Sequence, residues 1–435
     1  MTVDPQKVRI EGVYEQRQPG YFMLRVKVPG GVLSSEQALK VCEIAERFAG
    51  GGIHLTTRTS IEFHWLKEGD LAEAARMLQA VGLTSRGACG GAVRGVSCST
   101  QFSDDFPRVQ VLARKLHHHF TQNPHFENLP KKFKIGVDAG YEGARHLIQD
   151  AGLVLVETDG ESARYDVWAA GGLGREPVPG FLLEERVPEE RLILLVEALV
   201  RVYKQHTPKG KRLKHLLKEI GQEAFRKLLR EEIGREEVLV ISDGFQKRLT
   251  PQTAAGRPER VEARIFAGEL KVGTLRRLAE LAARHAAGFM ALTPEQNVAL
   301  FLTEDASAIE ATQALAGMGL CGGPSEEQVG FRICPGNHEC RMGLAPTRDI
   351  ARDILKVMGP EGSRLSWAIA GCPNSCSQPQ LAEMGIVTIK LVKEEGGERR
   401  ALFDLYRLEK RGAFGKLIRQ GIGLDELLQS VSAIG

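Results

Sequence analysis

One order of predicted elements occurs twice in this chain, about 237 positions apart, and it constrains the possible folds more than any other feature. The order is strand, helix, strand, strand, helix. Alternating apolar residues predict the strands, and apolar residues three and four positions apart predict the helices. Ser34 and Gln37 predict the start of the first helix as a capping box. The first copy is predicted to have strands over 21–28, 53–56 and 61–66, a helix ending at 50–52, and a second helix over 71–81.

The second copy begins with a predicted strand over 262–266, and its first helix ends at Gly288. Leu292–Asn297 matches Leu55–Ser60 in the first copy, at the same offset. A duplicated α+β unit predicts a pseudo-two-fold molecule with a site where the two halves meet. The competing interpretation is that any two α+β segments look alike at this level of detail.

Length and composition restrict the class of protein. A chain of 435 residues predicts two to four domains at roughly 100–200 residues each. Its 43% hydrophobic and 26% charged residues exclude disordered and fibrous classes. The net charge of +3 is too small to indicate a nucleic-acid partner. No apolar run reaches the roughly 20 residues of a membrane helix, and residues 1–7 lack an apolar signal core, so we expect a cytoplasmic protein without a membrane partner.

Four of the eight cysteines form two pairs near the C-terminus. Cys334 and Cys340 form a C-x5-C pair, and Cys372 and Cys376 form a C-x3-C pair. Four thiolates bind either zinc or an iron–sulfur cluster, and these spacings, looser than the usual zinc knuckles, favour the cluster. The remaining four cysteines show no such spacing: Cys42, Cys89, Cys98 and Cys321. We expect them to pack in the protein interior. A redox role remains an alternative for Cys89 and Cys98.

The segment Gly371-Cys372-Pro373-Asn374-Ser375-Cys376, preceded by the C-x5-C pair, resembles the signature of sirohaem-containing nitrite and sulfite reductases. The resemblance extends over nearly the whole chain. It includes the duplicated halves and the segments 23–25, 29–31, 55–58, 129–134 and 171–174. It implies a fold of two ferredoxin-like half-domains and two sirohaem- and cluster-binding α+β domains. The implied domains are 1–85, 86–250, 251–325 and 326–435, the first and third being the half-domains.

The resemblance also implies cofactors and site residues. The four paired cysteines would bind a 4Fe–4S cluster, and Cys376 would also bridge to the sirohaem iron. Arg58 would contact the sirohaem, and the weaker candidates for this role are Asn374, Gln296 and Asn297. The substrate is an anion, and the residues implied to bind it are Arg25, Arg94, Lys132 and Lys134.

Elementary chemistry agrees with these roles. Oxyanion reduction needs fixed positive charge, and lysine can also donate protons. Lys132 and Lys134 flank Phe133, so an extended backbone would point both to one side. Without the resemblance, an exposed basic edge would be the preferred interpretation.

The expected function is the six-electron reduction of sulfite to sulfide. Lys134 favours sulfite, because sulfite reductases have Lys at this position and plant-type nitrite reductases have Asn. In contrast, the 371–376 segment and Gln378 resemble the nitrite reductases at least as closely. Two further alternatives are a cobalamin-pathway monooxygenase of the same superfamily and a non-catalytic zinc- or cluster-binding scaffold. The scaffold alternative predicts that the four anion-binding residues do not converge. No dinucleotide or flavin motif is visible, so a separate ferredoxin or flavoprotein is the expected electron donor.

Two features depart from a simple interpretation. Glu62 stands where these reductases commonly have Gln, and a carboxylate facing an eight-carboxylate cofactor would have to be protonated or turned away. His117, His118 and His119 look like a metal-binding tract, but consecutive helical residues face different directions. We therefore expect a surface helix end there.

Overall fold

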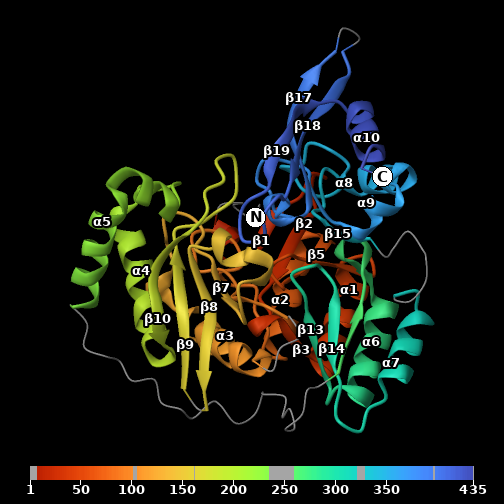
Figure 1. Ribbon diagram of the computed structural model, residues 1–435. Coiled ribbons are helices and arrows are strands. Elements are labelled where there is room, and N and C mark those ends of the chain that lie inside the picture. The colour runs from red at the N-terminus through yellow and green to blue at the C-terminus, as the bar shows by residue number, and fades with distance from the viewer. Residues whose placement is uncertain are drawn as a thin grey trace.

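The computed structural model describes residues 7–100, 105–160, 162–234, 259–320, 329–394 and 397–434 (Figure 1). It contains four β-sheets, each covered by helices, and the fold is an internally duplicated α+β architecture. Two sheets come from the repeated segments, and the other two come from the segments that follow each repeat. The predicted boundaries at 250 and 325, and Cys321, lie outside the described residues.

The repeat predicted from the sequence is confirmed element by element. Helices α1 and α6 lie 237 positions apart, as do strands β4 and β13. The Ser34 hydroxyl accepts a hydrogen bond from Gln37 N (3.1 Å), so the predicted capping box is present. The first half has β1 Val13–Glu15, β2 Phe22–Val26, β3 Val32–Ser34, α1 Ser35–Phe48, β4 Gly52–Leu55, β5 Ile61–Leu66 and α2 Leu71–Gln79. The second has β11 Arg260–Ala263, β12 Glu269–Lys271, α6 Val272–His285, β13 Phe289–Leu292, β14 Val298–Phe301 and α7 Ala308–Ala316.

One predicted strand is displaced. The sequence pattern placed it over 262–266, but β11 ends at Ala263 and a 3₁₀ turn begins at Phe266. The turn has a left-handed residue, Ala267 (φ 56°), which matches Gly30 (φ 58°) in the first copy. Because Ala267 replaces the glycine of the first copy, the residue pattern did not indicate a turn here.

The two halves exchange short strands. Strand β3 of the first half pairs with β13 of the second, with Leu33 opposite Met290. Strand β12 of the second half pairs with β4 of the first, with Leu270 opposite Ile53. These strands have three residues each, too few for alternation to reveal them, and the sequence pattern missed both. The exchange makes each half complete the sheet of the other.

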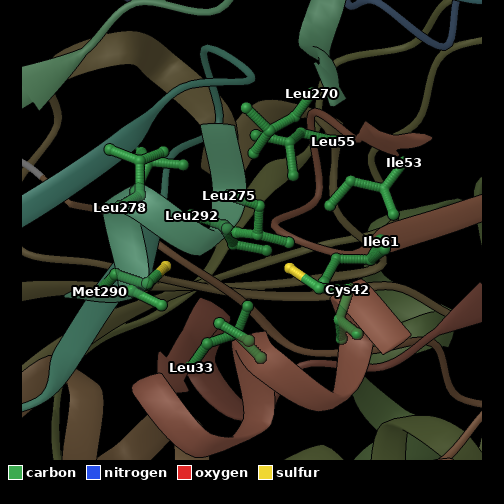
Figure 2. Packing of buried hydrophobic residues seen from close by; sticks show 14 of the residues in the cluster. Leu33, Cys42, Ile53, Leu55, Ile61, Leu270, Leu275, Leu278, Met290 and Leu292 are labelled. Atoms are coloured by element: carbon green, nitrogen blue, oxygen red, sulfur yellow. The ribbon is translucent and has the colours of Figure 1, made fainter. Parts of the chain in front are cut away.

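A single hydrophobic core lies between the exchanged strands (Figure 2). Leu33 and Cys42 of the first half pack in the same cluster as Leu275, Leu278 and Met290 of the second. Cys42 is fully buried on α1, which agrees with the predicted packing role.

The two remaining sheets share one topology. In each, the first three strands are parallel and the last two are antiparallel. The first has β6 Ser97–Cys98, α3 Phe106–Phe120, β7 Ile135–Asp138, β8 Ala151–Asp159, β9 Ser162–Ala169, β10 Phe181–Pro188, α4 Leu192–His206 and α5 Leu213–Ile233. The second has β15 Gly330–Ile333, α8 Thr347–Val357, α9 Pro360–Arg364, β16 Ser366–Ala370, β17 Met384–Lys393, β18 Arg399–Arg407, β19 Lys416–Ile422 and α10 Leu424–Ser432. The duplication therefore extends over the whole fold.

Figure 1 shows how these units meet. The β6–β10 sheet stands beside the two joined halves, and the β15–β19 unit lies across one end of both. Within the described ranges, no helix has the length and apolar character needed to cross a membrane.

Candidate functional site

A cavity lies where the four units meet. Each unit contributes to its wall: Arg25 comes from the first half, Lys132 from the first large domain, Gln296 from the second half and Cys376 from the second large domain. The site predicted at the junction of the halves is therefore present as a cavity.

The four residues expected to bind the anion all line this cavity: Arg25, Arg94, Lys132 and Lys134. Their convergence contradicts the scaffold alternative, which required them to be scattered.

The backbone explains how these residues come together. Phe133 pairs with Val93 in an isolated bridge, and Arg94 N donates to Phe133 O (2.8 Å). Phe133 is fully buried, so the lysines on either side of it point the opposite way, into the cavity. The predicted common side for Lys132 and Lys134 is confirmed.

Burial shapes the charge of the cavity wall. Burial, assisted by neighbouring cations, lowers the pKa of Lys132 to about 8. Burial likewise lowers the pKa of Lys134 well below its usual value, assisted by Lys132 and Arg58. Burial also lowers the pKa of Arg94. Buried cations lose hydration and repel one another. An anion bound beside them offsets part of this unfavourable free energy, so the cavity wall favours an anion.

Arg58 ties three segments together at the cavity wall. Its Nη1 donates to Gln149 Oε1 (2.8 Å), and its Nη2 donates to Gly95 O (2.8 Å) and Ile135 O (3.1 Å). Its bonding partners are thus neutral groups. Burial and neighbouring cations lower its pKa.

Glu62 differs from expectation. It is buried and lines the cavity, and it accepts hydrogen bonds from Arg25 Nε (2.9 Å) and Arg25 Nη2. Burial alone would raise its pKa, but Arg25 and His64 hold it well below the usual value. The expectation that it must be protonated or turned away is wrong, because Arg25 neutralises it in place.

The four paired cysteines gather at one edge of the cavity. Cys334 and Cys376 line it directly. Burial, assisted by the nearby Cys376 sulfur, raises the pKa of Cys334, Cys340 and Cys372, to about 11 for Cys340. Cys372 and Cys376 therefore lie within electrostatic range of each other and of both Cys334 and Cys340. Within the described residues, no three His, Cys, Asp or Glu side chains are close enough to hold one metal ion.

Glycines let the two cysteine loops pack closely. A Cβ on Gly371 would lie 2.8 Å from Gly336 Cα, and Gly371 N donates to Cys334 Sγ (3.1 Å). Any side chain at Gly371 would force these loops apart.

The loop of Cys376 is held by residues that the sequence analysis did not single out for this role. Thr57 Oγ1 donates to Cys376 O (2.8 Å), and Gln378 Nε2 donates back to Thr57 O (3.1 Å). Arg332 donates to Ser377 O (3.1 Å) and Gln378 O (3.2 Å). The only sequence signal was that Thr57 lies in the Leu55–Arg58 segment that carries the family resemblance.

Gln296 links the two halves at the cavity. Its Nε2 donates to Leu55 O (2.8 Å) and Ile333 O (3.0 Å). Asn297 instead bonds Glu262 and Ile265, outside the cavity wall.

Other predicted residues occupy different places. Asn374 is exposed, hydrogen-bonds the Cys372 thiol and is not part of the cavity wall. Cys89 lies beside Arg25 (Sγ to Nη1 3.7 Å), and Cys98 packs in a hydrophobic core. His117 is buried on α3, so the expected surface position is wrong for that residue, whereas His118 is exposed.

Comparison with protein-family models finds two matches. The nitrite/sulfite reductase ferredoxin-like half domain matches residues 14–81 and 260–317, which are the two exchanged-strand halves. The nitrite and sulphite reductase 4Fe-4S domain matches residues 93–237, which include Arg94, Lys132 and Lys134.

Individual relatives agree with these matches. A ferredoxin–nitrite reductase of Synechococcus elongatus is 30% identical over 403 residues, covering 86% of this chain and 78% of its own. A sulfite reductase [ferredoxin] of Mycolicibacterium paratuberculosis is 26% identical over 427 residues, covering 87% and 75%. In fold, the NirA protein of Mycobacterium tuberculosis matches with a TM-score of 0.83 at 24% identity, covering 98% of this chain and 85% of that one.

Proposed function

Because the chain belongs to the nitrite and sulphite reductase family, we propose that it reduces sulfite to sulfide by six electrons, using sirohaem and a 4Fe–4S cluster. One observation carries this proposal. Five basic side chains and the Cys376 thiol from distant parts of the chain line one cavity: Arg25, Arg58, Arg94, Lys132 and Lys134.

The residues present fit both cofactors. The C-x3-C thiols interact electrostatically with both thiols of the C-x5-C pair, and four such thiols are suitable ligands for an iron–sulfur cluster. We assign them this role: Cys334, Cys340, Cys372 and Cys376. A cavity with a surplus of buried cations suits a polycarboxylate cofactor, which Arg58, Cys376 and, at the loop edge, Asn374 would hold. When bound, the cluster relays single electrons and the sirohaem iron holds the substrate during reduction.

The protein itself supplies charge and protons. Arg94 and Arg25 present guanidinium groups that bind and orient oxyanion oxygens. Each oxygen removed leaves as water, so the reaction consumes protons as well as electrons. With its pKa lowered to about 8, Lys132 can hold a proton at Nζ and release it near neutral pH, and Lys134 lies on the same side.

Nitrite reduction to ammonia is the second candidate. Gln378 and the 371–376 segment resemble the nitrite branch, and the 30% identical relative bears that name. Lys134 favours sulfite, because it adds a cation where the plant-type nitrite enzymes have Asn.

We also propose a separate ferredoxin or flavoprotein as electron donor and a cytoplasmic location. Support for the donor comes from the names of the relatives, which include ferredoxin. All cysteines in the described ranges are free thiols, which suits a reducing compartment.

The test is anaerobic purification followed by a visible spectrum, acid-labile sulfide analysis, and turnover with reduced viologen. We expect sirohaem absorbance, four irons per cluster and sulfide from sulfite. Ammonia from nitrite without any sulfide would shift the assignment to nitrite, and absence of sirohaem absorbance would refute both. Cys340→Ser should abolish the cluster signal, whereas Cys42→Ala should keep it, because Cys42 lies in the shared core.

A further inference from the structure

The cavity wall carries one negative charge among its cations. Of the described residues that line it, Glu62 is the only carboxylate, and it lies with five Arg and Lys side chains. The expected roles of the cations do not explain why an acid is kept there.

The β-sheet fixes Glu62 against Arg25. The two residues are directly opposite each other on β5 and β2. Arg25 Nε donates to Glu62 Oε1 (2.9 Å) and Nη2 donates to the same oxygen, while Nη1 points toward Cys89 Sγ (3.7 Å). Two donors of one guanidinium on a buried carboxylate form a tight pair whose charges cancel.

The other arginines of the cavity are bound differently. Arg94 donates to two backbone carbonyls, Gly87 O (3.3 Å) and Gly90 O (2.8 Å), and Arg58 donates to an amide and two carbonyls. These neutral partners orient the side chains without cancelling their charge. Of the three arginines described in the cavity wall, Arg25 is therefore the one whose charge is neutralised by a carboxylate in direct contact with it.

We propose that Glu62 is a specificity-determining residue that sets the charge of the oxyanion the cavity accepts. A fixed negative charge in the wall lowers the local positive potential, and a dianion loses twice as much binding energy from this as a monoanion. Glu62 thus favours singly charged oxyanions, such as nitrite or hydrogensulfite, over the sulfite dianion. This inference rests on the proposed function, because it assumes that the oxyanion binds in this cavity.

Two histidines also face Glu62. His64 Nε2 lies 3.4 Å from Glu62 Oε2, and His54 on β4 contacts His64 edge-on at 6.1 Å between ring centroids. Their protonation would alter the potential for every anion, so the comparison must use one pH for both ligands.

The experiment measures dissociation constants of the holoenzyme for sulfite and nitrite from visible-spectrum titrations, at one pH where sulfite is the dianion. Glu62→Gln keeps an acceptor for Arg25 and removes the charge. We expect its affinity for sulfite to rise about tenfold relative to its affinity for nitrite. A structural role alone would change both affinities by a similar factor.

Glu127→Gln is the matched control. Glu127 is also buried and accepts two hydrogen bonds from one arginine, Arg86 (2.8 and 2.7 Å), but it is not part of the cavity wall. Its substitution should leave the sulfite-to-nitrite affinity ratio at the wild-type value.

A double variant keeps the inference testable if Glu62→Gln fails to fold. Arg25→Gln combined with Glu62→Gln removes one positive and one negative charge, so the net charge of the wall does not change. Both affinities should fall because the Arg25 donors are lost, while the sulfite-to-nitrite ratio should stay within about twofold of the wild type. An unchanged ratio in Glu62→Gln, or a tenfold change in the double variant, would overturn the inference. Wild-type enzyme that binds neither anion would instead refute the proposed function.

Discussion

Lys27 shows how one buried residue can hold part of the cavity wall. Its side chain is only 2% exposed, and its ammonium donates to Val93 O (3.0 Å) and Thr121 Oγ1 (3.4 Å). Val93 directly precedes Arg94, so Lys27 fixes the backbone from which Arg94 enters the cavity. Burial, assisted by Arg94, lowers the pKa of Lys27 to about 7.

This lowered pKa predicts a pH-dependent stability. Between about pH 7 and the ordinary lysine pKa of 10.5, the unfolded chain binds a proton at Lys27 that the folded chain has released. The Lys27 contribution to the free energy of unfolding therefore rises with pH in this window, by at most about 1.4 kcal/mol per unit. In Lys27→Met this contribution is lost, so its stability relative to the wild type should fall as pH rises from about 7 to about 10.

Chemical unfolding of both proteins at several pH values checks this expectation. Lys209→Met provides the control, because Lys209 is exposed and its variant should differ from the wild type by a constant amount. A flat difference for Lys27→Met as well would contradict the assignment.

Lys134 is the single side chain that we expect to select sulfite over nitrite. Lys134→Asn removes a cation from the cavity wall and should lower kcat/KM for sulfite about tenfold more than for nitrite. Lys131→Asn is the control, since Lys131 is exposed, three positions away and outside the wall. Equal losses for both substrates would show that Lys134 binds anions without discriminating between them.

At the scale of elements, the turn between β4 and β5 is fastened to the cysteine loop. Gln378 Nε2 donates to Thr57 O across 321 positions of sequence, and Thr57 Oγ1 donates to Cys376 O. A β-hairpin of one unit thus fixes the loop of another.

Thr57→Val should loosen this contact while preserving the volume of the side chain. The Cys376 carbonyl would lose a buried donor, at a cost of about 1–3 kcal/mol. We expect the variant to lose iron to a chelator several-fold faster than the wild type. Thr303→Val, which removes a hydroxyl that donates to His285 O (3.4 Å) in the second half, should lose iron at the wild-type rate.

At the scale of the whole molecule, the exchanged strands make the two halves one folding unit. Leu33 is fully buried, and its strand pairs with the second half. Leu33→Ala should therefore destabilise the protein by about 2–5 kcal/mol through a cavity that both halves line.

Thermal unfolding followed by circular dichroism checks this expectation. The two halves should melt in one transition, shifted to lower temperature in Leu33→Ala. Leu39→Ala is the control, because Leu39 lies on α1 nearby but is 40% exposed, and its effect should stay within about 0.5 kcal/mol. Two separated transitions in Leu33→Ala would contradict a shared core.

The repeat could be predicted from sequence patterns, because helix and strand periods and capping residues such as Ser34 and Gln37 act over a few positions. The paired cysteines could also be read from their local spacing. The family resemblance predicted four cations for anion binding, and all four line the cavity. Local rules could not reveal the exchange of β3 and β12, because three-residue strands show no period.

Ion pairs and hydrogen bonds between residues far apart in sequence became visible only in the folded molecule. Glu62 looked unfavourable in sequence because its partner, Arg25, is 37 positions away and becomes a neighbour only through strand pairing. The link between Thr57 and Gln378 likewise depends on two units meeting at one cavity. Ionisation and hydrogen bonding depend on distances in space, and folding alone brings these groups within reach of one another.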